Sequence, residues 1–221
     1  MPAPQVFDTL IPEARAFLSE LDANNTRDWF LDNKDRYDSE LKAPALALLD
    51  VVAADLERMT GHRVSPKLFR PQRDIRFSKD KTPYKTHLHM LWDIDGGSGS
   101  GLDRSAFYFG VELDRIVLGG GCMGMDKAKL VAFRKRVASP KGKDLMRAMA
   151  AASAEGTRFS DPDLKRVPAP FPTDHPQGEL LKHKTLTFWR EVDGGTKDLR
   201  KTLQGGFAKL MPLQEWLLAL K

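Results

Sequence analysis

The chain has 221 residues, 41% hydrophobic and 29% charged, and no apolar run of the ~18 residues that a membrane helix needs, so its composition excludes disordered and membrane-spanning classes. The single cysteine, Cys122, excludes an internal disulfide, and the first residues show no signal-peptide pattern, so we expect a cytoplasmic protein. The net charge is +5, but residues 63–90 hold eight basic and two acidic residues, a net +6, whereas the rest carries −1. This local excess favours an anionic partner.

The first 60 residues are predicted to be helical. Apolar residues at helical spacing predict a helix over residues 12–22. Thr26 is a candidate N-cap for a second helix, which Pro44 is expected to kink or split. A third helical pattern covers residues 46–59 and stops at Thr60-Gly61.

The middle of the chain changes to the alternating pattern of β-strands. Residues 62–84 contain three prolines and are expected to form an extended loop with a short strand at 75–77. From Lys85 the apolar residues alternate, with Met90 and Trp92 facing inward. A glycine turn at 96–101 leads to strands at 106–113 and 116–118. Three successive strands joined by short turns predict an antiparallel sheet.

The C-terminal half is predicted to be mainly helical. Gly119-Gly120-Gly121 is expected to end the third strand, and helices follow at 126–137 and 139–152. Residues 156–178 are proline-rich and irregular, and 185–192 form a last strand. A terminal helix over 196–220 is expected to be interrupted at Gly205-Gly206. The fold class is therefore α+β in a single domain over 1–221, with N-terminal, middle and C-terminal helices packed around a mainly antiparallel sheet.

The segment from Arg70 to His87 is the predicted functional site, because clustered arginines and lysines hold phosphate or carboxylate groups. Ile75 and Phe77 are expected to anchor it in the core. We predict a small anionic ligand, and for an enzyme the candidate bases and acids are Asp74, Asp80, Tyr84 and His87. The candidate ligand-binding residues are Arg70, Arg73, Arg76, Lys79, Lys81 and Lys85.

Two other interpretations of this segment remain open. A nucleic-acid-binding module would show a broad basic surface with exposed aromatic residues such as Phe77 and Tyr84. A structural role would instead show buried, mutually paired arginines and aspartates that pin the loop across the sheet. The sequence predicts neither a cofactor nor an oligomeric state.

Other patterns are weaker indications of function. His87, His89 and Asp93 share a strand face, with Glu112 on the neighbouring strand, but the positive surroundings oppose cations, so no metal site is predicted. The three glycines at 119–121 match no phosphate-binding motif and indicate close strand packing. Cys122 is expected to be a buried structural thiol, and Trp29-Phe30 to belong to the core.

The string RDIRFSKDKTPYKTH, with NNTRDWF and LDNKDRY before it and LKRVP, DHP and LLKHKT after it, resembles the domain-of-unknown-function family 2461. The resemblance covers roughly residues 17–218. It implies an α+β single-domain protein and brings no established activity or catalytic residue with it. Cys122-Met123-Gly124-Met125 departs from the proline-bearing turn expected there. The matching residues are Asn25, Trp29, Phe30, Lys34, Tyr37, Arg70, Arg73, Asp74, Arg76, Phe77, Lys79, Asp80, Lys81, Pro83, Tyr84 and Lys85.

Overall fold

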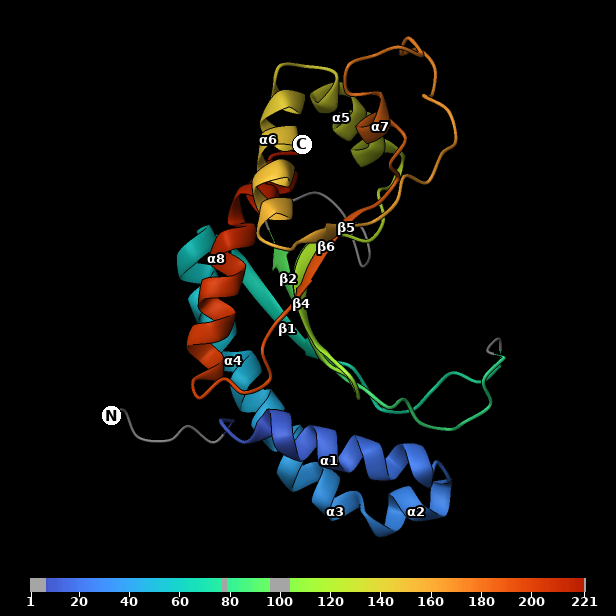
Figure 1. The fold of residues 1–221 in the computed structure, drawn as a ribbon, viewed down its shortest axis with the longest axis vertical. Helices are drawn as coiled ribbons and strands as arrows, with labels where there is room; N and C mark the ends of the chain where they lie inside the picture. Colours follow the sequence, from blue (N-terminus) through green and yellow to red (C-terminus); the bar gives the residue numbers. More distant parts are fainter. Residues whose placement is uncertain (1–6, 77–78, 96–103, 221) are drawn as a thin grey trace.

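The computed structural model describes residues 7–76, 79–95 and 104–220, and for Asp95 only the backbone. A six-stranded antiparallel sheet forms its centre, with strand order β1-β2-β3-β4-β6-β5 (Figure 1). The α+β prediction is confirmed. The strands are β1 Arg63–Leu68, β2 Leu88–Asp95, β3 Ser105–Val111, β4 Ile116–Cys122, β5 Arg158–Phe159 and β6 Leu186–Glu191.

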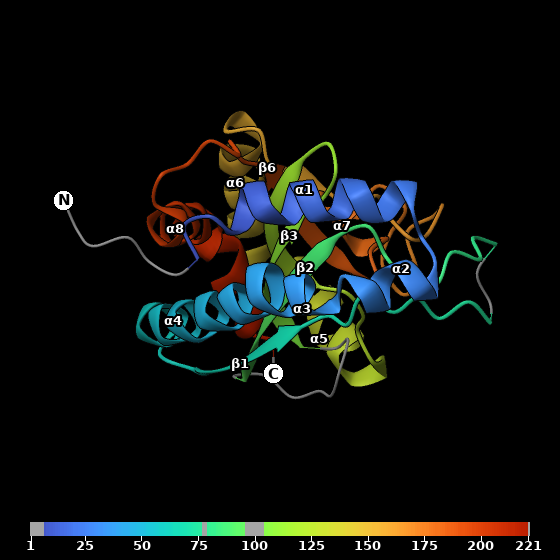
Figure 2. The ribbon, with the colours of Figure 1, turned by 90° about the horizontal axis from the view of Figure 1, so that it is seen from below.

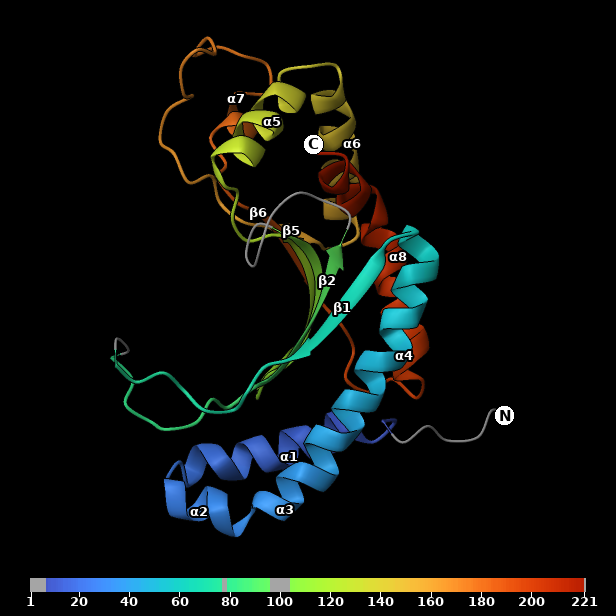
Figure 3. The same cartoon turned by 180° about the vertical axis from the view of Figure 1, so that it is seen from behind.

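Most of the N-terminal helices lie beneath one end of the sheet, and the last of them runs along one of its faces (Figure 3). They are α1 Leu10–Ala23, α2 Arg27–Asp32, α3 Lys34–Arg36, a π-helical segment Tyr37–Lys42 and α4 Ala43–Thr60. Thr26 caps α2 by accepting a hydrogen bond from the Trp29 amide at 3.3 Å. The predicted kink or split at Pro44 is not seen as a break, because Lys42 and Ala43 keep helical dihedrals and the chain changes from π-helical to α-helical geometry directly before Pro44. Gly61, with φ of 69°, ends α4 as predicted.

The C-terminal half supplies α5 Lys127–Val137, α6 Lys141–Ala154, the short α7 Gly178–Leu181 and α8 Leu199–Leu218. Asp126 caps α5 by accepting from the Lys129 amide at 2.7 Å. Among the described helices, none is long and apolar enough to cross a membrane. The predicted interruption of α8 at Gly205-Gly206 is wrong. Gly206 instead lets the helix approach the sheet, because a Cβ there would lie 2.4 Å from Leu118.

The two long helices α4 and α8 cover one face of the sheet, and the core lies between them and the strands (Figure 3). Met90, Trp92, Phe107, Phe109 and Leu118 point into this core and are buried. The alternate residues, such as His87, His89 and Tyr108, lie on the opposite face and are half-buried. The prediction of which β2 residues face inward is therefore confirmed.

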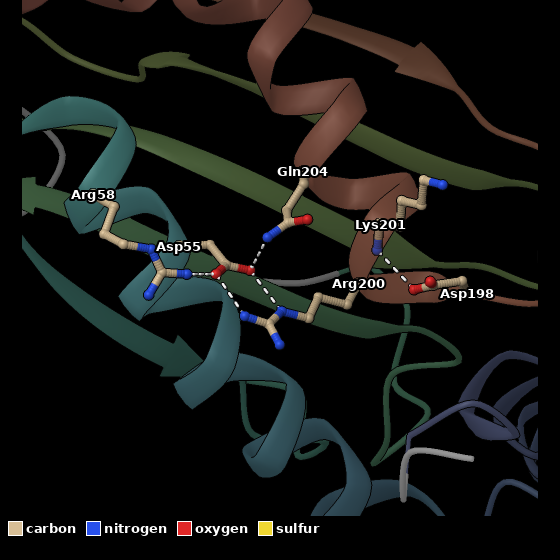
Figure 4. A network of polar contacts seen from close by, with 6 residues as sticks. All are labelled: Asp55, Arg58, Asp198, Arg200, Lys201 and Gln204. Atoms are coloured by element: carbon tan, nitrogen blue, oxygen red, sulfur yellow. Dashed lines mark hydrogen bonds and ion pairs between the residues drawn. The ribbon is translucent and has the colours of Figure 1, made fainter. Parts of the chain in front are cut away.

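A buried carboxylate joins these two helices (Figure 4). Asp55 of α4 is 3% exposed and accepts two hydrogen bonds of 2.8 Å from Arg200 and one of 2.5 Å from Gln204, both on α8. Arg58, one turn along α4, forms a further ion pair. The hydrogen bonds from Arg200 lower the pKa of Asp55 more than its burial raises it. Asp55 is thus ionised and fully paired, which fixes α4 against α8.

Three further sequence predictions are corrected. Residues 63–68 form β1 rather than loop, since Pro66 is tolerated in an edge strand, whose outer nitrogen needs no partner. The glycines at 119–121 continue β4 and do not end it. A Cβ on Gly119 would lie 2.3 Å from the Phe188 carbonyl oxygen, so they allow close strand packing, as predicted. Leu113 lies beyond β3 and is exposed.

Candidate functional site

The basic segment forms an arm that continues β1 and β2 beyond the sheet. We use "arm" for the described residues 69–76 and 79–87. The Phe69 amide donates to the His89 carbonyl at 3.0 Å, the Lys85 amide to Pro71 at 2.8 Å, and the Arg73 amide to Pro83 at 2.8 Å. The two halves therefore pair as an antiparallel hairpin. Figures 1 and 3 show the arm projecting away from the sheet, on the same side as α2.

The arm is tethered to the helical hairpin that Figure 2 shows running along the base of the molecule. Asn25, just before α2, donates to the Tyr84 carbonyl at 3.0 Å and accepts from the Tyr84 amide at 3.1 Å. The Tyr84 ring is buried and stacks on Phe30, with centroids 4.0 Å apart. Tyr84 is thus an anchor between the arm and α2, and it lacks the exposure that the nucleic-acid interpretation requires of it.

The tip of the arm is exposed and its carboxylates are paired locally. Asp74 accepts from Arg76 at 2.9 and 2.7 Å, and this hydrogen bonding lowers the pKa of Asp74. Asp80 accepts from the amide and hydroxyl of Thr82 at 2.9 and 2.8 Å, which lowers its pKa, and Arg73 pairs with it at 3.0 Å. Because the pKa of each carboxylate is lowered, neither is suited to accept a proton as a general base at neutral pH.

The expected anchoring of the tip in the core is wrong for Ile75, which is 41% exposed and lies outside any strand. Phe77 and Ser78 lie outside the described residues, as does the predicted glycine turn at 96–101. Lys81 donates to the Ile75 carbonyl at 2.8 Å, whereas Lys79 is exposed. The polar contacts of the tip are therefore local ones that shape the hairpin.

The root of the arm differs, because three cations gather there and only one of them, Arg73, forms an ion pair in the described structure. We use "arm root" for Arg70, Arg73 and Lys85. Burial and the charges of Arg70 and Arg73 lower the pKa of Lys85, so the three groups lie close enough to repel one another. Lys85 Nζ donates to the Arg70 carbonyl at 3.4 Å. Among the described residues, neither Arg70 nor Lys85 forms an ion pair.

Arg73 has unused hydrogen-bonding capacity at the same place. Its Nη2 donates to the Tyr84 carbonyl at 3.4 Å, but its Nε is buried and has no partner in the described part of the chain. A buried donor without an acceptor costs free energy. The structure thus brings together three of the six predicted cations, while Arg76, Lys79 and Lys81 belong to the tip.

His87 adjoins the arm root directly before β2, close enough to Glu112 for that carboxylate to influence the pKa of its imidazole. Its ring stacks on that of His89, with centroids 3.6 Å apart and planes inclined by 14°. Burial and the nearby Lys85 lower the pKa of His87, and burial and His87 lower that of His89 to about 3. Both imidazoles are therefore neutral at pH 7 and present aromatic faces beside the cations.

No group of three or more metal-ligating side chains occurs among the described residues. His89 Nε2 lies 3.7 Å from Glu112, but Glu112 is held by Arg115 at 2.7 Å. Cys122 is buried, as predicted, and its thiol donates to the Gly124 carbonyl at 2.7 Å. Trp29 and Phe30 pack in the core, also as predicted.

Two surface grooves lie away from the arm. One, of about 520 Å³, runs between α4 and α8 and has Asp55 in its lining, a residue that the sequence analysis missed. The signal was available, because Asp55 falls between Val52 and Leu56 on the apolar side of the helix. Because protein donors occupy the acceptor positions of the Asp55 carboxylate, we assign Asp55 a structural role. The second groove, of about 380 Å³, is lined by residues 165–182.

Comparison with known proteins settles the family. The family model described as "Conserved hypothetical protein (DUF2461)" matches residues 13–216. The chain belongs to this family. No curated protein matches its sequence. The DUF2461 match includes the arm, the α1–α2 hairpin and α8, so the Asn25–Tyr84 tether and the arm root both lie within the family region.

Proposed function

We propose that this DUF2461 protein binds a small phosphate- or carboxylate-bearing ligand at the arm root. The observation that carries the proposal is the convergence of Arg70, Arg73 and Lys85, where Lys85 Nζ lies 3.4 Å from the Arg70 carbonyl and neither Arg70 nor Lys85 forms an ion pair in the described structure. Like charges that are close together and partly buried raise the free energy through repulsion and desolvation, and a bound anion would offset both.

The rigidity of the arm root supports the same proposal. The main chain on both sides is hydrogen-bonded across the hairpin, and Asn25 and Phe30 hold Tyr84, the residue before Lys85. A preorganised site loses little conformational entropy on binding. The half-buried position of Lys85 and Arg73 also reduces screening, so an anion would interact with them more strongly than with the exposed cations of the tip.

The test is titration calorimetry of the full chain with pyrophosphate and citrate at low and high salt. Arg70→Ala and Lys85→Met are each expected to weaken binding about 10-fold, since a charge-assisted hydrogen bond contributes about 1.5 kcal/mol. Lys143→Met, which removes the same charge from the exposed face of α6, is the matched control and should bind like the parent protein. Equal losses in all three variants would show only a general charge effect and would reject the site.

A further inference from the structure

The arm root is continuous with a cluster of aromatic rings on the uncovered face of the sheet. His87 and His89 stack on each other, and Lys85 precedes them where the pairing of the hairpin shifts from Phe69–His89 to Pro71–Lys85. His89 is enclosed, because Phe69 and Tyr108 meet its ring edge-on at centroid distances of 6.5 and 5.1 Å. His87 is the outer ring of the stack, and the charge of Lys85 acts on its imidazole.

The two faces of the His87 ring differ in their aromatic neighbours. Its inner face lies against His89, 3.6 Å away. Among the described aromatic residues, no second ring contacts His87, and the side chain is only half-buried. A planar ring placed on the outer face would extend the existing stack by one member. This arrangement is favourable because offset and parallel rings attract through dispersion and burial of apolar surface.

The fixed position of the stack follows from its neighbours. Gly110 faces His89 across the strands, and a Cβ at this position would lie 2.5 Å from the hydroxyl oxygen of Tyr108. The missing side chain lets Tyr108 lie along its own strand and close the edge of His89. The stack is also uncharged at neutral pH, so it adds an aromatic surface beside the cations and no further positive charge.

We propose that the ligand of the arm root is a nucleotide, whose base stacks on His87 while its phosphate contacts Lys85 and Arg70. The inference rests on the proposed function, which supplies the phosphate contacts. Residues two positions apart, such as Lys85 and His87, have Cα atoms at most about 7 Å apart, a span that a ribose between base and phosphate can bridge. A simple anion would use the cations alone and leave the ring surface unused.

The same chemistry occurs in a free nucleotide and in one unit of a single-stranded nucleic acid. The site as described holds one ring platform next to one cation cluster, so we expect a single nucleotide unit to account for the affinity. The charged tip, with Arg76, Lys79 and Lys81, would contribute only to a longer chain of phosphates.

The experiment compares adenosine monophosphate, ribose 5-phosphate and inorganic phosphate by titration calorimetry on the full chain. Base stacking is expected to make the nucleotide bind roughly 10- to 100-fold more tightly than ribose 5-phosphate. His87→Ala should abolish this difference, whereas His87→Phe, which keeps a ring at the position, should retain most of it. Thermal unfolding of both variants checks that they fold.

The outcomes separate the two proposals. If ribose 5-phosphate and the nucleotide bind equally well, the nucleotide inference is overturned and the anion site stands. If none of the three compounds binds, the proposed function fails and this inference fails with it. A short single-stranded oligonucleotide that binds no more tightly than the mononucleotide supports a one-unit site. Tight oligonucleotide binding that His87→Ala leaves unchanged overturns the inference, because the phosphate backbone alone would then carry it.

Discussion

The charged cluster around Asp55 and the arm root use the same residue types to opposite effect. At Asp55 one buried carboxylate is shared by two arginines and a glutamine amide, and every acceptor position is occupied (Figure 4). At the arm root the cations of Arg70 and Lys85 have no ion-pair partner in the described structure. Balance of charge therefore distinguishes a structural network from a binding site, and burial alone does not.

The largest expected effect on stability is at the charged cluster around Asp55. Asp55→Asn keeps the volume but leaves Arg200 and Arg58 without their carboxylate, so we expect a loss of about 2–3 kcal/mol in the free energy of unfolding, measured by urea denaturation. The partial exposure of both arginines, at 36% and 65% of the side chain, keeps the loss below that of a fully buried pair. Asp144→Asn on α6, in an exposed network, is the control and should leave stability unchanged. Similar midpoints for both variants would contradict this assignment.

The neutral histidine stack gives the second effect, a dependence of stability on pH. The folded pKa of His89 is about 3, below the unfolded value of 6.5, so between these values the unfolded chain binds more protons. Because of His89, the free energy of unfolding is highest above pH 6.5 and decreases as the pH is lowered, by about 2 kcal/mol at pH 5. His89→Phe should reduce the loss of stability between pH 7 and 5. Parallel pH curves for the two proteins would contradict the expectation.

The tether of the arm gives a smaller effect. Asn25→Ala removes two hydrogen bonds to the Tyr84 backbone and should lower the free energy of unfolding by about 1–2 kcal/mol. Hydrogen exchange of the Arg73 and Lys85 amides, which pair across the arm, should become faster, while exchange in α8 should change little. Asn24→Ala, which loses only a contact within α1, is the matched control. Unchanged arm exchange would show that Phe30 alone holds the arm.

The smallest effect on stability is expected at Lys85. It separates the arm root most clearly from the Asp55 cluster, because stability should rise while ligand binding is lost. Lys85→Met removes a cation whose pKa is lowered by burial and by like charges, so it should raise the free energy of unfolding slightly, by less than about 0.5 kcal/mol given solvent screening. The same variant should lose ligand binding. If Lys85→Met lowered both the free energy of unfolding and the affinity for the ligand, Lys85 would have a structural role.

Much of the fold could be predicted from local patterns, whereas the site could be predicted only in part. Caps such as Thr26 and Asp126 and the alternation from Leu88 to Ile94 act within a few residues, so they are visible in the sequence. β1 was missed because Pro66 suggested a loop, and only the sheet order shows that it lies at an edge.

The site depends on contacts between distant residues. The pairing of Asn25 with Tyr84 spans 59 positions and that of Asp55 with Arg200 spans 145, so no sequence pattern indicates them. Composition located the basic segment but did not distinguish its tip, whose carboxylates are paired locally, from its root, where Arg70 and Lys85 form no ion pair in the described structure. That distinction required the fold of the hairpin, which places Arg73 beside Asp80 and Lys85 beside Arg70.

The edge strand β1 affects how readily a second molecule could pair with the sheet. An edge strand with free amides and carbonyls is a template on which a second molecule can add a strand. Pro66 has no amide hydrogen to offer, and the neighbouring Arg63 and Lys67 are exposed charges that would repel a second copy of the same strand. At the other edge, β5 is only two residues long. Pro66, which obscured β1 in the sequence, thus also disfavours the addition of a further strand at this edge.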